Sequence, residues 1–524
     1  MTAILRSVLS ISVATVFSRA TGYARWSVQA AVLGGGIVAD AYTVSLLLPG
    51  LIYELFMGGI LYSIFIPVLV DRITREGEED ARRLTNALFT LVLPLMAVLA
   101  LVGIVFAEPL VRLATDWDSV GTLSRGEAQR TVDLAVLFFR IFALQMLFYG
   151  LSTIATGVLQ SHRRFFLPTF APVLNNLLVI ASFVAYALLL DADRTAAVYA
   201  LAGGVTAGVA VMALALVPTM LSLGYRPRPQ LGHPALLPTA RLAGPMVVLV
   251  VASVAFQMFG AYLATGFEAA AELNYAFTIF SLPYGVFVVA IATALMPELS
   301  EKHSRGDAEG YRDTFSFGLR TMAFVVIPSS VGMSALAEPI VGLLYERGRF
   351  GPQDTEVVSQ LLAVYSVGLL GYSVYFFLVR AFYSRQNTKT PALLNVLILA
   401  LYAALAYGLS RTPLQVVGVV LALSLSYAVL ALLSLLATRR EIQRIDGRRL
   451  LTSLLKILVA GAAMFAVART GTVLLGVGSN TLERALVLAA AGGASLAVYV
   501  GVALTLGTEE LKSVVALLRR RRTA

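Results

Sequence analysis

Long hydrophobic stretches alternate with short polar breaks along almost the whole chain. Each stretch is long enough to cross a hydrocarbon core of about 30 Å as a helix that rises about 1.5 Å per residue. The pattern predicts an all-α integral membrane protein. Its fourteen predicted transmembrane helices cover residues 5–33, 39–70, 84–107, 131–159, 168–190, 196–221, 238–264, 269–298, 314–337, 356–383, 391–410, 413–437, 450–470 and 482–506.

Two motifs recur at the same separation, which indicates an internal duplication. FIPVL at 65–69 resembles LMPEL at 295–299, and AEPLVRL at 107–113 resembles AEPIVGL at 337–343; both offsets are 230 residues. Six predicted helices, an even number, separate the copies, so both copies have the same orientation. We therefore expect two six-helix lobes, related by a pseudo-twofold axis along the membrane normal, around a central cavity. The predicted parts are an N-lobe at 1–222, a cytoplasmic linker at 223–237, a C-lobe at 238–438, and an appendage at 439–524 with two helices and a basic tail.

Composition agrees with a membrane protein and narrows the possible chemistry. Of the 524 residues, 58% are hydrophobic and 13% are charged, and the mean hydropathy is +0.82. The chain has no cysteine, which excludes disulfides and cysteine-ligated metal sites. His162, His233 and His303 fall in polar connections, and no Walker A motif occurs. We therefore expect no cofactor, no metal and no enzymatic activity.

The net charge is +10, and the distribution of the basic residues is typical of membrane topology rather than of a nucleic-acid-binding surface. Basic residues concentrate in the even-numbered connections and in the tail, in the ranges 72–83, 163–164, 226–241, 302–320, 385–389, 439–449 and 519–522. By the positive-inside rule, both termini are predicted to be cytoplasmic. Contact with anionic membrane lipids is the expected role of the basic tail, and no nucleic-acid partner is expected.

Charged residues within the first two predicted helices are the strongest functional signal. On a helical wheel, an arc of about 140° around Arg19 holds the small or polar residues Ser12, Thr15, Ser18, Gly22, Arg25 and Gln29. A polar stripe of this kind is costly against lipid, so it should face protein or water.

The acids Asp40 and Glu54 in the second helix leave two interpretations of the arginines open. In the first, Arg19 or Arg25 forms a structural ion pair with one of these two acids. In the second, the two arginines bind an anionic group such as a phosphate.

Several small residues and one proline are candidate hinges. Gly22, Gly34, Gly58 and Gly59 permit close backbone approach or bending, and Pro283 lies in the eighth helix. Close packing of helices is the alternative role of these residues. The charged segment ERGRF at 346–350 is expected to form a re-entrant or surface turn.

Several separated segments of the chain resemble the MurJ (MviN) family of lipid II flippases. They are SRATGYAR at 18–25 followed by Asp40 and FIPVL, LPYGVFVVAIATALMPELS at 282–300, AEPIVGLLYERGRF at 337–350 and AFYSRQNTKTP at 381–391. That family belongs to the multidrug/oligosaccharidyl-lipid/polysaccharide (MOP) exporter superfamily. The resemblance implies movement of the undecaprenyl-diphosphate-linked peptidoglycan precursor between leaflets by alternating access, driven by a coupling ion or the membrane potential. It also implies that Arg19 and Arg25 engage the diphosphate and that Asp40 is the acid that opens the second helix.

This chain departs from the family pattern at two places. The family typically has PNxxRRxxxEGA in the second helix, whereas this chain has PGLIYELFMGG at 49–59, so Tyr53 and Glu54 replace an arginine pair. The family typically has YADR in the eighth helix, whereas this chain has Tyr275, Ala276, Phe277 and Thr278. The candidate substrate-binding residues are therefore Arg19, Arg25, Gln29, Asp40, Tyr53, Glu54 and Tyr275.

From these observations we expect a monomeric lipid II flippase of the bacterial inner membrane, or a transporter of a related undecaprenyl-diphosphate-linked glycan. The first alternative is a cation-coupled drug or metabolite exporter with Glu54 as its proton or sodium site. The second is a non-transporting membrane scaffold for cell-wall enzymes, in which the charges form structural pairs.

Overall fold

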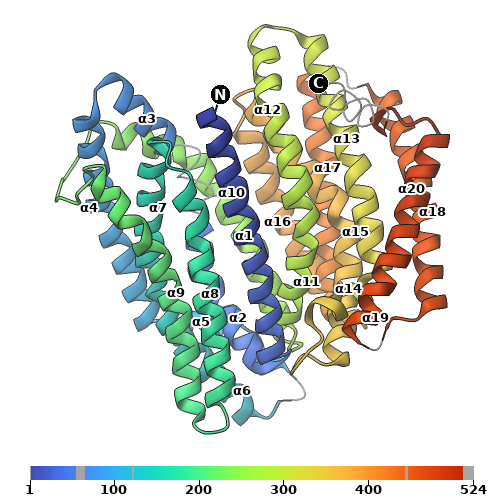
Figure 1. Cartoon of the computed structure of the whole chain (residues 1–524), viewed down its shortest axis with the longest axis horizontal. Coiled ribbons are helices and arrows are strands. Elements are labelled where there is room, and N and C mark those ends of the chain that lie inside the picture. The colour runs from blue at the N-terminus through green and yellow to red at the C-terminus, as the bar shows by residue number, and fades with distance from the viewer. Residues whose placement is uncertain (1, 55–64, 121–122, 443–445, 479, 512–524) are drawn as a thin grey trace. The chain divides into compact units, whose positions relative to one another are not determined.

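The computed structural model describes residues 2–54, 65–120, 123–442, 446–478 and 480–511. Helices account for the regular structure of these residues, and no strand occurs among them (Figure 1). The helices of the first half are α1 (Thr2–Leu33), α2 (Ile37–Glu54), α3 (Ile66–Arg75), α4 (Glu78–Val105), α5 (Ala107–Ala114), η2 (Trp117–Ser119), α6 (Arg125–Ala143), α7 (Gln145–Ser161), α8 (Phe166–Leu189), α9 (Arg194–Ser222) and α10 (Leu236–Thr265).

The second half continues with helices of similar length. They are α11 (Ala270–Pro283), η3 (Tyr284–Val288), α12 (Val289–Ser304), α13 (Ala308–Ala335), α14 (Ala337–Tyr345), α15 (Pro352–Tyr383), α16 (Lys389–Ser410), α17 (Gln415–Glu441), α18 (Gly447–Leu475), α19 (Thr481–Val487), η4 (Leu488–Gly492) and α20 (Gly493–Thr505). Each predicted span coincides with one or more of these helices. In the described part, eleven helices are long and apolar enough to cross a membrane. The all-helical membrane fold is thus confirmed, while the count of fourteen spans stays a prediction.

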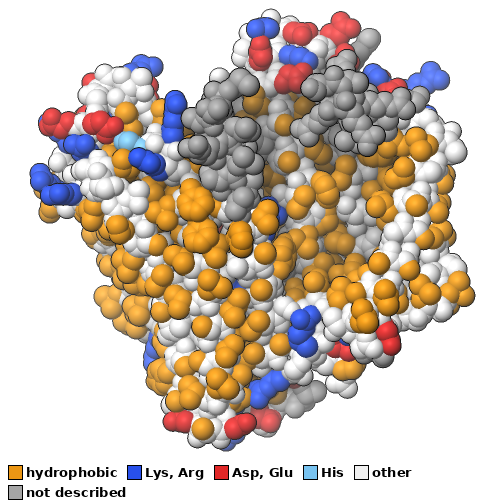
Figure 2. Space-filling model, viewed as in Figure 1, with side chains coloured by type: hydrophobic (Ala, Val, Ile, Leu, Met, Phe, Trp, Pro, Cys, Tyr) orange, Lys and Arg blue, Asp and Glu red, His pale blue; other side chains and the backbone are white. Residues whose placement is uncertain are grey.

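Hydrophobic side chains cover the middle of the helices on the face shown in Figure 2, and charged side chains gather near the helix ends. Val98 on α4, Leu188 on α8 and Val473 on α18 are examples of apolar side chains more than half exposed. In a soluble protein such a surface would aggregate. We therefore infer that this apolar surface faces the lipid hydrocarbon of a membrane.

The chain forms two compact units, which are considered separately. The first contains Met1–Ala271 together with Arg347–Phe350, and the second contains Glu272–Glu346 and Gly351–Ala524. In the first unit, α8 packs on α1 and α9, and α7 packs on α4 and α9. In the second unit, α17 packs on α15 and α16, and α13 packs on α15 and α18. The boundary near residue 271 differs from the predicted linker at 223–237, and the two pseudo-symmetric lobes remain a prediction.

The secondary structure repeats with the offset of the sequence motifs. Helices α4 and α13 each have 28 residues, and their bounds, Glu78–Val105 and Ala308–Ala335, differ by the same 230 positions as the motifs. A single residue, Phe106 or Leu336, then separates each from a short helix, α5 or α14, which starts at Ala107 or Ala337. These helices therefore end and restart at corresponding residues in the two halves.

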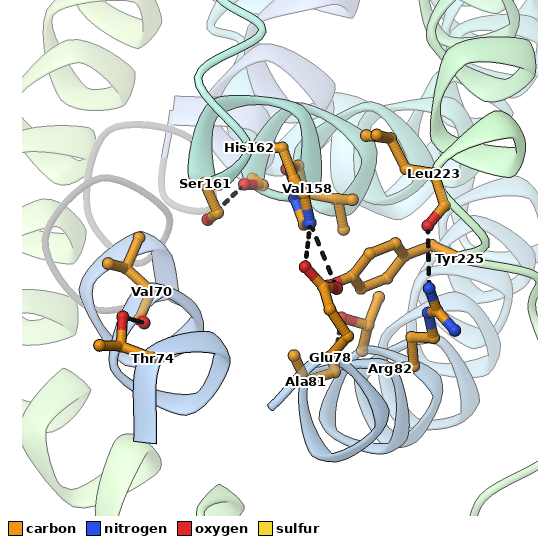
Figure 3. Close-up of polar contacts among 12 residues, drawn as sticks. Val70, Thr74, Glu78, Ala81, Arg82, Val158, Ser161, His162, Leu223 and Tyr225 are labelled. Atoms are coloured by element: carbon orange, nitrogen blue, oxygen red, sulfur yellow. Dashed lines mark hydrogen bonds and ion pairs between the residues drawn. The ribbon is translucent and has the colours of Figure 1, made fainter. Parts of the chain in front are cut away.

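Polar side chains join α4 to α7 and to the segment after α9 at one end of the first unit (Figure 3). His162 Nε2 lies 3.1 Å from Glu78 Oε1, and the Tyr225 hydroxyl donates to Glu78 Oε2 over 3.0 Å. His162 Nδ1 lies 2.9 Å from the Val158 carbonyl oxygen, which only accepts. Both ring contacts are therefore satisfied as hydrogen bonds when both nitrogens carry a proton. Burial and the neighbouring Glu78 carboxylate raise the pKa of Tyr225, so its hydroxyl stays a donor.

Replacing Glu78 with glutamine is expected to lower the stability of this end of the first unit by about 1 kcal/mol. The substitution replaces the carboxylate that contacts His162 and accepts from Tyr225 with a neutral amide. Thermal unfolding of the purified protein measures the effect. The control is Glu79→Gln, since Glu79 is exposed and paired only with Arg83 among the described residues. Equal losses for the two variants would disprove the stabilising role of the Glu78 contacts.

A buried ion network in the second unit joins α13, α18 and the segment after α20, whose residues Glu509 and Glu510 are helical. Arg320 Nη1 on α13 lies 2.6 Å from Glu509 Oε2 and 3.0 Å from Glu510 Oε1. Arg449 Nη2 on α18 lies 2.7 Å from the same Glu509 oxygen, and Ser453 donates to Glu510 Oε1 over 2.9 Å. The side chains of Arg320 and Glu510 are 7% and 2% exposed. The sequence pattern grouped Arg320 with the basic residues of a connection, but the structure places it inside α13, paired with carboxylates.

Candidate functional site

The polar stripe predicted on α1 lies within the first unit. Along it Arg19 is exposed, Arg25 is half-buried and Gln29 is buried. The Asn176 side chain of α8 packs beside the stripe and donates to the Ser18 carbonyl over 3.4 Å and to Thr21 Oγ1 over 3.2 Å. Part of the stripe therefore faces protein, as predicted, and packs against α8.

Arg25 retains binding capacity beyond its contacts within the protein. Its guanidinium carbon lies 5.1 Å from the ring centroid of Trp26, which is a cation–π contact. Its Nε atom is buried and makes no hydrogen bond to any of the described residues. An arginine presents five N–H donors in a planar fork, and an unmatched buried donor is costly. An anionic oxygen or a water molecule is the natural partner of this group.

Tyrosines on neighbouring helices interact with Arg25 or with one another. Arg25 interacts electrostatically with the hydroxyls of Tyr42 on α2 and Tyr149 on α7. The ring centroids of Tyr149 and Tyr53 are 4.5 Å apart, and the Tyr149 hydroxyl donates to the side chain of Gln145 over 3.2 Å. The candidate residue Tyr53 thus packs on one of the two phenols that interact with Arg25.

Sequence reasoning missed Tyr42, Tyr149 and Gln145. Gln145 is fully buried at the start of α7, next to Leu144, where the predicted single helix over 131–159 divides into α6 and α7. A glutamine in the middle of an apolar span was the available signal, because such a residue needs a partner within the protein.

Glu54 is not paired with either arginine in the described part of the chain. Its carboxylate is exposed and hydrogen-bonds with the side chain of Gln257 on α10. The ion pair between Glu54 and Arg19 or Arg25, one of the two interpretations of the sequence, is therefore not formed in this structure. Both arginines keep their positive charge unmatched by Glu54.

Asp40 has a clear structural contact. Its side chain is fully buried, and Oδ1 accepts a hydrogen bond of 2.7 Å from the backbone nitrogen of Ala271 in the first turn of α11. A carboxylate at this place satisfies an N–H group that the helix itself leaves open and interacts favourably with the helix dipole. Asp40 thus positions the start of α11 relative to α2, and its contact with a diphosphate stays a prediction.

Tyr275 belongs to the second unit, where it is fully buried and packs on Tyr345 with ring centroids 5.2 Å apart. Tyr275 is thus a core residue of the second unit. The other candidates all lie in the first unit, and they are Arg19, Arg25, Gln29, Asp40, Tyr53 and Glu54.

The candidate hinges have different surroundings. Gly22 faces Asn176, and a Cβ at Gly22 would lie 3.6 Å from that side chain, an ordinary contact. Pro283 ends α11 and is followed directly by the π-helical turn η3. Gly58 and Gly59 lie outside the described residues.

Gly34 follows α1 with φ +71°, and its added Cβ would lie 2.8 Å from the Arg349 carbonyl oxygen. The reciprocal contact is tighter: Gly348 has φ +61°, and its Cβ would lie 2.3 Å from the Ala31 carbonyl oxygen. Arg349 also donates its backbone N–H to Ala31 over 2.9 Å. The ERGRF segment thus forms the expected turn, and residues 347–350 pack on the end of α1 in the first unit.

Replacing Gly34 with alanine is expected to destabilise the first unit more than replacing Gly36. Gly36 has φ +82° with nothing within 4 Å of its added Cβ, so Gly36→Ala carries only the left-handed strain of roughly 1–2 kcal/mol. The Gly34→Ala substitution also places a methyl group too close to the Arg349 carbonyl oxygen, which is expected to cost about a further 1 kcal/mol of stability or more. Denaturation of the two purified variants compares them directly. An equal loss of stability in the two variants would show that Gly34 is needed only for its left-handed backbone conformation and not for the close approach of Arg349.

Among the described residues, no group of three His, Asp or Glu side chains could hold a metal ion.

Comparison with known proteins places these features in a family. The sequence model described as "Lipid II flippase MurJ" matches residues 29–480, most of the chain. The chain belongs to the MurJ family.

Curated MurJ relatives match over long stretches. Lipid II flippase MurJ of Burkholderia cenocepacia is 30% identical over 404 residues, covering 76% of each chain. A probable lipid II flippase MurJ of Bdellovibrio bacteriovorus is 30% identical over 524 residues, covering 98% of this chain and 96% of the relative. The match to the MurJ family model begins after Arg19 and Arg25, but the long relatives extend over nearly the whole chain.

Solved structures show the same fold. A MurJ structure titled "inward closed conformation" covers 96% of this chain and 99% of its own, with a TM-score of 0.74 and 21% identity. An inward-facing multidrug resistance MATE family transporter of the MOP superfamily covers 83% of this chain and 98% of its own, with a TM-score of 0.67 and 15% identity. The MurJ fold, the family and the many apolar helices together identify a multi-pass protein of the inner membrane.

Proposed function

We propose that this chain moves lipid II across the inner membrane. Membership of the MurJ family over residues 29–480 carries the proposal, and curated relatives that span nearly the whole chain bear the same description. The half-buried Arg25, whose Nε donor has no hydrogen-bond partner among the residues that the structure describes, supports it at the level of a site. No catalytic step is part of this function.

In this proposal the diphosphate of the lipid binds near Arg19 and Arg25, within the group of Gln29, Tyr53 and Tyr149. Bidentate arginine contacts suit phosphate oxygens, and a low-polarity surrounding strengthens them. Asp40 holds the start of α11, and Glu54 moderates the positive charge from the exposed end of α2. The undecaprenyl tail stays in the hydrocarbon.

The proposed architecture has fourteen spans in two six-helix lobes, 1–222 and 238–438, with two further helices in 439–524 and both termini in the cytoplasm. The equal bounds of α4 and α13 at an offset of 230 residues support the duplication. The basic ranges of the even connections support the orientation. Alternating access of the lobes, by a monomer that uses an ion gradient or the membrane potential, completes the cycle.

Complementation tests the proposal directly. A host depleted of its own lipid II flippase should regain growth and outer-leaflet lipid II when this chain is expressed and inserted at normal levels. Purified protein should also bind lipid II. Normal insertion without growth and without binding would reject the function.

Glu54 motivates a second candidate, a cation-coupled exporter of the same superfamily. The carboxylate is exposed and bonded to the neutral Gln257 rather than to an arginine, so it remains available to a proton or sodium ion. This candidate predicts that Glu54→Gln abolishes export of a small amphiphile driven by a cation gradient. Under the lipid II proposal, the same variant retains lipid II binding.

A further inference from the structure

A small cavity lies in the first unit where α1 and α8 end. Its volume is about 170 Å³. The last turn of α1, the end of α8 with the residues just beyond it, and the turn 347–350, which belongs to the first unit, form its walls. The lining residues that matter for binding are Ala31, Tyr186, Asp191 and Arg349. We call this space the α1–α8 cavity.

The turn on one side of the α1–α8 cavity is held closely to α1. Arg349 donates its backbone N–H to the Ala31 carbonyl oxygen over 2.9 Å. At Gly348 the two backbones approach so closely that a Cβ would collide with the same oxygen. The backbone at Arg349 is thus fixed by α1, while Arg349 itself is exposed and lines the cavity.

The α1–α8 cavity carries one charge of each sign. Asp191 and Arg349 both line it, and both are exposed. Neither side chain forms an ion pair within the part of the chain that the structure describes. Both charges are therefore open to a ligand. Two opposite charges in one cavity complement a molecule that itself carries one charge of each sign.

A buried phenol favours a cation on the α8 side of the cavity. Tyr186 lines the cavity but is only 2% exposed, so packing holds its ring in place. The face of a tyrosine ring attracts an ammonium group, most strongly where water is excluded. Tyr186 and Asp191 thus favour a cation on this side, and Arg349 favours an anion on the side of the turn.

An exposed apolar stripe of α8 leads to the cavity. Leu177, Val184 and Leu188 are 51%, 46% and 77% exposed, and their spacing places them on one helix face with Asp191. Helix α8 is also long and apolar enough to cross a membrane. The stripe therefore meets lipid chains along its length. It reaches Asp191 where the apolar stretch ends, which is the depth of the lipid headgroups.

We propose that the α1–α8 cavity binds the headgroup of a zwitterionic phospholipid whose cation is ethanolamine. Arg349 binds the phosphate, and Asp191 accepts hydrogen bonds from the primary ammonium beside the ring of Tyr186. The acyl chains lie along the exposed stripe of α8. A choline headgroup has the same charges but no N–H to donate, and a glycerol headgroup has no cation, so both bind less tightly.

This site is separate from Arg25, and the inference stands whether or not the chain moves lipid II. The bound headgroup contacts α1, α8 and the turn 347–350 together. It therefore stabilises the packing of this turn on the end of α1. The phospholipid composition of the membrane thereby influences the stability of the first unit.

Three phospholipids with identical acyl chains test the site. Phosphatidylethanolamine, phosphatidylcholine and phosphatidylglycerol are titrated into the purified full-length protein, and binding is measured by native mass spectrometry. The parent should bind phosphatidylethanolamine about tenfold more tightly than phosphatidylglycerol, with phosphatidylcholine between them. Asp191→Asn should weaken phosphatidylethanolamine about tenfold and leave phosphatidylglycerol within about twofold, because only the former carries an ammonium. Arg349→Gln should weaken all three lipids, because each carries a phosphate.

Matched controls remove exposed charges elsewhere in the first unit. Asp118 and Arg125 are exposed and do not line the cavity. Asp118→Asn and Arg125→Gln should therefore bind all three lipids like the parent, which separates the cavity from the lipids that coat the rest of the surface. Thermal unfolding confirms that each variant is folded. Added phosphatidylethanolamine should raise the Tm of the parent more than that of Asp191→Asn.

Two results would overturn the site. The first is equal affinity of the parent for phosphatidylethanolamine and phosphatidylglycerol, and the second is an equal loss for these two lipids in Asp191→Asn. Soluble phosphoethanolamine, the headgroup without chains, tests the contribution of the α8 stripe and should fail to displace the lipid at equal concentration. Displacement at equal concentration would show a site for a small zwitterion and would overturn the lipid proposal. If Asp191→Asn is unstable, the uniform loss expected of Arg349→Gln decides.

Discussion

Replacing Arg25 with alanine is expected to abolish complementation of a flippase-depleted host while membrane insertion stays normal. Arg25 combines a half-buried position with an Nε donor that no group in the described part of the chain satisfies, so we expect its loss to remove a charged contact to the substrate rather than an internal pair. Truncating one partner of a buried charge pair costs about 2–5 kcal/mol, which corresponds to a loss of at least roughly 30-fold in affinity. Growth of the host and binding of lipid II to purified protein are the two measurements.

Two further variants sharpen this result. Arg25→Lys keeps the charge but loses the planar fork, so it should recover binding only in part. Arg75→Ala should behave like the parent, because Arg75 is 76% exposed and paired with Asp71 four residues away on α3. Full growth with Arg25→Ala would exclude the diphosphate role, and a general loss of folded protein would favour a structural role for the arginine.

Replacing Arg320 with methionine is expected to destabilise the second unit by about 3–5 kcal/mol. The side chain of Glu510 is 2% exposed, and without Arg320 its charge would stay buried without compensation. The double variant Arg320→Met/Glu510→Gln should regain most of the loss, since replacing both members of a buried pair is often neutral. Unfolding of the two variants and of Glu510→Gln alone forms a double-mutant cycle. Independent, additive losses would contradict the buried pair.

The same network predicts sensitivity to acid. Hydrogen bonds from Arg449 and Arg320 lower the pKa of Glu509 below its usual value. A carboxyl with a lowered folded-state pKa contributes stability above its unfolded pKa and loses it as the pH falls through the folded value. The difference in stability between the parent and Glu509→Gln should therefore shrink toward acidic pH. The effect is modest because Glu509 is 54% exposed.

The helices were predictable because hydrocarbon demands long apolar segments, and the duplication was visible because two motifs kept one offset. Contacts between residues that are distant in the sequence could not be predicted. The Asp40 carboxylate bonds to Ala271, 231 residues later, and no local pattern marks a backbone N–H as its partner. Arg320 was assigned to a basic connection because, in the sequence alone, basic residues in the first turns of a helix look the same as basic residues of the preceding loop.

Part of the candidate site could also be predicted from the sequence. Periodicity placed Arg19, Arg25 and Gln29 on one stripe, since side chains along one helix obey a fixed angle. It could not tell that Glu54 hydrogen-bonds to Gln257 on α10, or that the hydroxyls of Tyr42 and Tyr149 interact electrostatically with Arg25.

The Arg320 network also has a consequence for biosynthesis. Glu509 and Glu510 follow Arg320 by 189 and 190 residues, so α13 leaves the ribosome long before its partners exist. At roughly 5–20 residues per second, the delay is about 10–40 s. Throughout that interval the guanidinium must be held by water, lipid phosphate or the insertion machinery. Only when the segment after α20 has been synthesised does α13 gain the two carboxylates that pair with Arg320 in the folded second unit.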